Sequence, residues 1–153
     1  MKINTTRFGE IEGDEKNIFQ FDMPILGYKD EKEFILIDSK EAALFKWLQS
    51  TKTADLAFLV TAPGFFGIDY VFELPEEAEV ALDIKQAEEL VVLNIAKVPN
   101  NNPRETTVNM LAPLVFNVTN NKAGQVILSG SGFDVTYPLF QNNNEKESQK
   151  EGE

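Results

Sequence analysis

Three carboxylates, Asp69, Glu73 and Glu76, lie close enough along the chain to do chemistry together. Two carboxyl groups at a suitable separation can act as general acid and general base, or hold a hard cation such as Ca²⁺ or Mg²⁺. Carboxylates that are close in sequence are common in acidic proteins, and this chain has 25 acidic residues among 153. A solvated acidic edge is therefore the favoured interpretation. A carboxylate-based metal-binding or hydrolytic β-barrel protein is the alternative.

The chain contains no histidine and no cysteine. Their absence removes Ser-His and Cys-His nucleophilic pairs, disulfides, and every zinc or iron site built on imidazole or thiolate. The run Gly130-Ser131-Gly132 lacks the Lys-Ser or Lys-Thr pair of a phosphate-binding loop, so we interpret its glycines as turn residues. We expect no enzyme activity, no metal and no cofactor.

Acidic residues outnumber basic ones by 25 to 14, which gives a formal net charge of −11. Nucleic-acid binding needs a basic surface that displaces phosphate counterions, so the charge argues against direct DNA or RNA binding. Residues 73–89 hold seven acidic residues against one lysine, a local net charge of −6. This stretch is either a solubilising helix face or an acidic patch that steers a basic protein partner.

The loop at residues 62–68 places two adjacent phenylalanines, Phe65 and Phe66, between Gly64 and Gly67. Adjacent residues of an extended chain face opposite sides, so at least one of the two rings should face solvent or another chain. We take both as candidate apolar anchors of a partner-binding surface. The candidate acidic rim of that surface consists of Glu73, Glu76, Glu77 and Glu79. The alternative is a loop that folds over the core and buries both rings.

Short apolar runs of strand length, separated by Gly, Pro, Asn and Asp, predict a mostly β fold. We expect strands over residues 34–37, 44–49, 56–61, 70–74, 90–98, 106–119, 125–128 and 133–139. Pro113 should interrupt the strand at 106–119, and residues 120–124 should form the turn of a hairpin. Pro75 and the acidic residues after it predict one or two short helices between residues 75 and 90.

A small antiparallel β-barrel, or a two-sheet sandwich, would hide the edges of these strands. We expect residues 1–140 to form a single β-barrel-like domain. Residues 141–153 contain no apolar side chain and are expected to be a disordered tail. Because no apolar run approaches the roughly 18 residues of a membrane helix and no apolar leader follows Met1, we expect a cytoplasmic protein with no membrane contact.

Seven segments carry a family resemblance: TTRFGEI at 5–11, FKWLQS at 45–50, DLAFLV at 55–60, YVFELP at 70–75, TVNMLAPLV at 107–115, QVIL at 125–128 and YPL at 137–139. In this order they resemble the FliW family of flagellar assembly factors, over nearly the whole chain up to Phe140. None of the segments is a chemical motif, so the likeness depends on their number and order. The family offers no catalytic residues to transfer.

The resemblance implies a non-enzymatic bacterial regulator with a small β-barrel-like fold. Proteins similar to this one bind newly made flagellin in the cytoplasm. They also bind the translational repressor CsrA, an RNA-binding dimer that blocks translation of flagellin mRNA. Export of flagellin frees the factor to capture CsrA, allosterically and away from the RNA surface, and translation resumes. A generic scaffold for other partners is a further interpretation.

Overall fold

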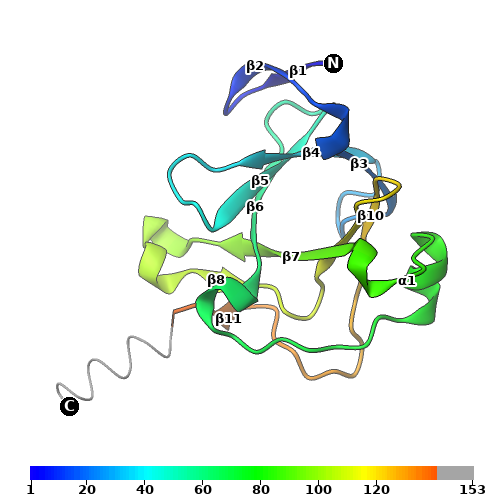
Figure 1. Cartoon of the computed structure of the whole chain (residues 1–153). Helices are drawn as coiled ribbons and strands as arrows, with labels where there is room; N and C mark the ends of the chain where they lie inside the picture. Colours follow the sequence, from blue (N-terminus) through cyan, green and yellow to red (C-terminus); the bar gives the residue numbers. More distant parts are fainter. Residues whose placement is uncertain (141–153) are drawn as a thin grey trace.

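Seven strands close into a barrel in the computed structural model, which describes residues 1–140 (Figure 1). Their order is β7-β6-β5-β4-β3-β10-β9, and β9 pairs with β7 to complete the ring. The barrel strands are β3 (Ile18–Met23), β4 (Glu33–Asp38), β5 (Phe45–Ser50), β6 (Ala57–Thr61), β7 (Leu90–Lys97), β9 (Leu114–Asn117) and β10 (Lys122–Gln125). The mostly β barrel predicted from sequence is confirmed. All its pairings are antiparallel except the parallel pair β3–β10.

The remaining elements flank the barrel. A hairpin of β1 (Lys2–Thr5) and β2 (Gly9–Glu12) lies at one end, and β8 (Thr107–Val108) and β11 (Tyr137–Pro138) extend the sheet beyond β7. The helical turns are α1 (Glu76–Ala81), η1 (Glu15–Asn17), η2 (Pro63–Phe66), η3 (Ala87–Glu89), η4 (Pro99–Asn101) and η5 (Pro103–Glu105). No helix within residues 1–140 is long and apolar enough to cross a membrane. The predicted disordered tail lies outside the described residues.

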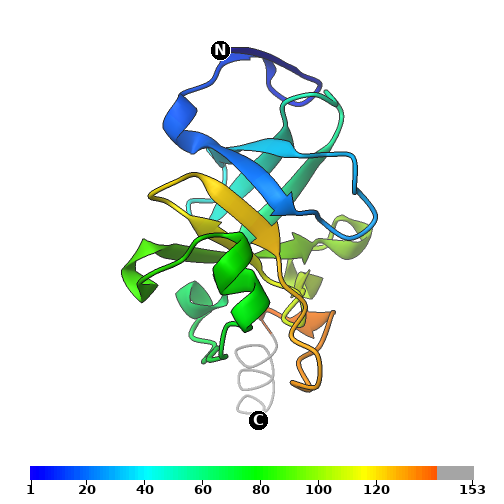
Figure 2. The ribbon, with the colours of Figure 1, turned by 90° about the vertical axis from the view of Figure 1, so that its right-hand side faces the viewer.

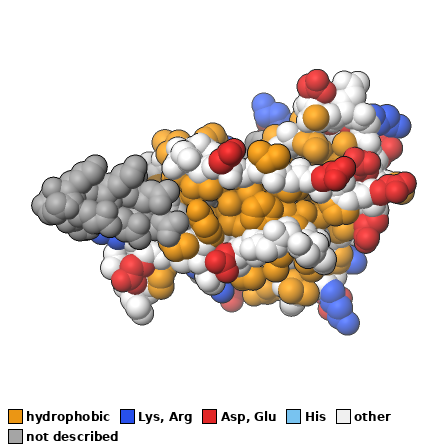
Figure 3. All heavy atoms as spheres, turned by 90° about the horizontal axis from the view of Figure 1, so that it is seen from below, with side chains coloured by type: hydrophobic (Ala, Val, Ile, Leu, Met, Phe, Trp, Pro, Cys, Tyr) orange, Lys and Arg blue, Asp and Glu red, His pale blue; other side chains and the backbone are white. Residues whose placement is uncertain are grey.

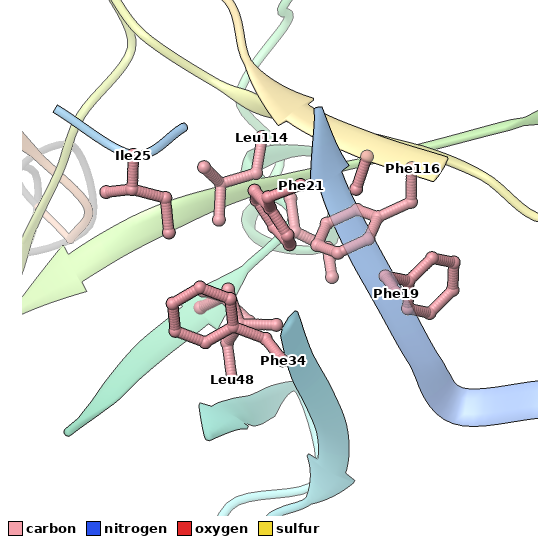
Figure 4. Close-up of a cluster of buried hydrophobic side chains, with 10 residues drawn as sticks. Phe19, Phe21, Ile25, Phe34, Leu48, Leu114 and Phe116 are labelled. Atoms are coloured by element: carbon pink, nitrogen blue, oxygen red, sulfur yellow. The ribbon is translucent and has the colours of Figure 1, made fainter. Parts of the chain in front are cut away.

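The barrel interior is rich in phenylalanine (Figure 4). Phe19 and Phe21 point inward from β3 and meet Phe116 of β9 edge to face, with ring centroids 5.0 and 5.8 Å apart. Phe21 also contacts Phe34 of β4 at 5.1 Å. Edge-to-face pairs of this kind contribute about 0.5–1.5 kcal/mol each beyond the area they bury. These contacts join β3 to its neighbour β4 and to β9, which lies beyond β10 on the other side of β3.

The helix α1 lies on the outside of the barrel (Figure 2). It covers a second apolar cluster. Ala78 and Leu82, four residues apart and so on one helix face, are fully buried against Val115 and Val126. Past the helix end, the side-chain amide of Asn117 donates to the carbonyls of Leu82 and Asp83, at 2.9 and 3.3 Å. The expectation of one or two short helices between residues 75 and 90 is confirmed by α1 and η3.

Four predicted strands, at 34–37, 44–49, 56–61 and 90–98, are confirmed as β4, β5, β6 and β7. The prediction of a strand at 70–74 is wrong, because these residues pair with no strand within the described chain. The long strand predicted at 106–119 is two short strands, β8 and β9. Between them the side chain of Asn109 accepts a hydrogen bond from the Ala112 backbone N–H, which turns the chain before Pro113.

Two further boundaries differ from the prediction. The hairpin turn falls at residues 118–121, because Asn121 adopts a left-handed φ of +61° and Lys122 already pairs with Asn117. The partner strand therefore ends at Gln125 and not at Leu128, although Val126 and Leu128 still donate to the carbonyls of Pro113 and Leu111. The last predicted strand, 133–139, is reduced to the two residues of β11.

Candidate partner-binding surface

The underside of the barrel carries a broad apolar surface with acidic side chains gathered at one end (Figure 3). An extended segment, residues 67–75, crosses this side of the molecule and joins η2 to α1 (Figure 1). The candidate anchors therefore lie at the start of the segment, and the candidate acidic rim lies at its end.

The two adjacent phenylalanines of η2 have different environments. Phe65 is 59% exposed. Phe66 packs against Phe45 and Phe140, with ring centroids 5.6 and 5.4 Å apart. The turn closes at Gly67, whose φ of +78° is a left-handed conformation that side chains with a Cβ rarely adopt. Phe65 is thus available to a partner, whereas Phe66 holds the turn on the barrel.

The acidic side chains of α1 face solvent. Glu76, Glu77 and Glu79 are exposed because Ala78 and Leu82 occupy the buried face of the helix, and Glu73 is exposed just before it. No salt bridge involves any of these four carboxylates in the part of the chain that the structure describes. Within residues 1–140 no basic side chain neutralises their negative charge, which leaves it to act on an approaching partner.

A groove of about 590 Å³ runs between the extended segment and β7. Its lining is mainly apolar and includes Val71, Phe72, Leu74, Ile84, Leu90 and Val92, with Glu79 and Lys85 among the polar residues. Two valines in this part of the molecule are strongly exposed, Val71 at 78% and Val80 at 73% of their surface. Neither valine was predicted from the sequence as part of a binding surface. The exposure of Val71 could have been predicted from the alternation of Tyr70, Phe72 and Leu74 with Val71 and Glu73.

A hydrogen-bond network fixes the start of the extended segment. The Tyr70 hydroxyl donates to the carbonyl of Met110 at 2.6 Å and accepts from the side-chain amide of Asn94 at 3.2 Å. Burial raises the pKa of Tyr70 above its ordinary value of 10.0, although the hydrogen bond from Asn94 opposes the rise. The phenol is therefore protonated at neutral pH and remains the donor to Met110.

The three carboxylates singled out in the sequence as candidates for a catalytic or metal site all face solvent. Asp69 and Glu73 are exposed on the extended segment, and Glu76 begins α1. Residues 1–140 contain no group of three or more carboxylates arranged to hold a metal ion. All three carboxylates lie at the surface, where the interpretation as a solvated acidic edge places them.

The family model described as FliW protein matches residues 2–139 of this chain. The chain belongs to the FliW family. Among curated relatives, the flagellar assembly factor FliW of Natranaerobius thermophilus is 32% identical over 146 residues, covering 95% of this chain and 97% of that protein. The FliW of Thermoanaerobacter pseudethanolicus is 35% identical over 142 residues, covering 92% and 94%. The family resemblance noted in the sequence is thus confirmed.

A solved structure also matches this FliW chain. It is described as the crystal structure of the flagellar assembly factor FliW, and it superposes with a TM-score of 0.83 at 32% sequence identity. The match covers 92% of this chain and 97% of that one. The barrel, with its single α-helix within residues 1–140, is therefore the FliW fold.

Proposed function

We propose that this FliW protein is a non-enzymatic flagellar assembly factor that binds flagellin and antagonises the translational repressor CsrA. The observation that carries the proposal is the family match over residues 2–139, with relatives named flagellar assembly factors. Binding to flagellin and CsrA follows from the family resemblance of the sequence. In this account the protein acts in the cytoplasm, and free FliW relieves CsrA repression once flagellin has been exported.

The charge of the chain supports a basic partner. An RNA-binding protein carries a positive field, and that field attracts an acidic protein even when the two meet away from the RNA site. Unpaired carboxylates on α1 raise the rate of encounter with such a partner, while exposed apolar side chains such as Phe65 and Val80 supply contact area. The acidic rim thus governs association, and the apolar surface governs residence time.

Association kinetics with purified CsrA test this division. The triple variant Glu76→Lys, Glu77→Lys, Glu79→Lys changes the net charge from −11 to −5. A matched control, Glu10→Lys, Asp30→Lys, Glu41→Lys, makes the same change at exposed residues outside α1. We expect the α1 variant to associate with CsrA about 10-fold more slowly at low salt, and the association rate of the control variant to fall much less. Equal slowing of both variants would remove α1 from the interface.

A further inference from the structure

Residues 69–74 have the side-chain pattern of a β-strand without a neighbouring strand. Asp69, Val71 and Glu73 are exposed, whereas Tyr70, Phe72 and Leu74 are partly buried. This period of two is that of a strand lying on a core. Within the described residues, no backbone N–H or C=O group from Asp69 to Leu74 forms a backbone–backbone hydrogen bond. The segment therefore presents free backbone donors and acceptors.

The inward side chains hold this segment in place. Tyr70 is bonded to Met110 and Asn94, and its ring packs on Phe72 and Phe133 with centroids 5.2 and 5.1 Å apart. Phe72 and Leu74 pack against the cluster beneath α1. A partner that pairs with the segment does not have to order it first, so binding avoids that entropy cost.

We propose that residues 69–74 are a free strand edge to which a partner protein adds an extended segment that alternates Lys or Arg with apolar residues. An added strand would pair its backbone with the free groups, as in other β-augmentation complexes. Directly opposite residues share a face, so the partner's basic residues would lie beside Asp69 and Glu73. Its apolar residues would face the groove beside the segment, which Leu90 and Val92 line.

The charges of the edge argue against the other occupants. If a second copy of this chain paired antiparallel about Val71, Asp69 would lie opposite Glu73 of that copy, and like charges directly opposite are destabilising. Residues 141–153 contain no apolar side chain for the groove. A basic and apolar segment of another protein satisfies both the outer face and the groove. The inference rests on the geometry of residues 69–74 and not on the proposed function. A synthetic peptide tests it without flagellin or CsrA.

Amide hydrogen exchange measured by NMR on the full chain is the test. The probe is a short capped peptide that alternates Val with Lys, added up to about 1 mM, the weak end of specific affinity. Its controls are the same peptide with Glu for Lys and a peptide of the same composition with the valines in one block. We expect the alternating Lys peptide alone to slow exchange of every second amide within 69–74 by about 2-fold or more at about 1 mM, the slowing of a site that is at least half occupied.

A charge-swapped variant separates strand addition from general attraction. Asp69→Lys with Glu73→Lys should weaken binding of the Lys peptide by about 3- to 30-fold and allow the Glu peptide to bind. The control variant Asp30→Lys with Glu41→Lys, of equal net charge, should keep the original preference. Absence of alternate amide protection, equal effects of the peptides, or an unchanged preference in the swapped variant would overturn the proposal. Slow exchange at 69–74 in a dimer of the chain alone would assign the edge to a second copy and would overturn it too.

Discussion

Truncation of the two adjacent phenylalanines should have unequal effects on stability. Phe65→Ala removes a ring that is 59% exposed, whereas Phe66→Ala removes a ring packed between Phe45 and Phe140. The two substitutions delete the same atoms at neighbouring positions of one short turn. Any difference between them therefore reports the environment of each ring and not the chemistry of the change.

The magnitudes follow from burial. Full burial of a phenylalanine contributes about 1.5–3 kcal/mol, and Phe65 buries about two-fifths of its surface, so its loss should cost about 1 kcal/mol. Phe66 buries most of its ring and also loses two aromatic contacts, so its loss should cost about 3 kcal/mol. For a chain of this length the corresponding decreases in Tm are about 3 °C and about 9 °C.

Differential scanning calorimetry of the two variants and the parent chain measures these decreases, and urea titration gives the free energies of unfolding. The variant Phe65→Ala should also bind CsrA more weakly while remaining folded, because an exposed apolar anchor contributes more to binding than to folding. Equal loss of stability in the two variants would refute the assignment of Phe65 to the surface. Full stability of Phe66→Ala would refute the packing of Phe66 on the barrel.

Three further substitutions test the account elsewhere. Gly124→Ala should destabilise the chain by about 1–3 kcal/mol in urea unfolding, because a Cβ there would lie 2.6 Å from Cβ of Met23 at the irregular β3–β10 pairing; an unchanged unfolding midpoint would contradict that pairing. Tyr70→Phe should cost about 1–3 kcal/mol through the lost hydrogen bond to Met110, with Tyr28→Phe as a control of no effect. Burial raises the pKa of Glu31, but hydrogen bonds from Thr53 and Ser50 and the charge of Lys52 outweigh this, and the net pKa is below its ordinary 4.5. The ionised carboxylate therefore stabilises the fold above pH 4.5. Glu31→Gln should be less stable than the parent chain at pH 7, and the difference in stability should shrink as the pH falls through the lowered pKa. A difference that does not change with pH would contradict this role of Glu31.

Much of the barrel could be predicted from local pattern. The runs that became β4 to β7 are apolar, rich in β-branched or aromatic residues, and bounded by turn residues, so sequence alone located them. The alternation of Phe19 and Phe21 with Gln20 and Asp22 also indicates a strand, yet β3 was not among those predicted. The hairpin β1–β2 gave a weaker signal, since Ile3 and Thr5 are its buried side chains in a polar run.

The parts that sequence could not locate depend on contacts between distant residues. The alternation of adjacent residues predicted that at least one ring of the Phe65–Phe66 pair would face outward. Which ring does so depends on Phe140, which packs on Phe66 from the far end of the described chain. The period of two at residues 70–74 predicted side-chain burial correctly and strand pairing wrongly. Local sequence encodes which side chains face the core, whereas the presence of a neighbouring strand is a matter of topology.

Calorimetric titration of the full chain with purified CsrA and, separately, with flagellin from the same organism tests the central claim most directly. The account predicts saturable binding to each partner, and a changed affinity for one partner when the other is already bound. Binding to neither partner would contradict it, and would leave a FliW fold whose partners in this organism are other proteins.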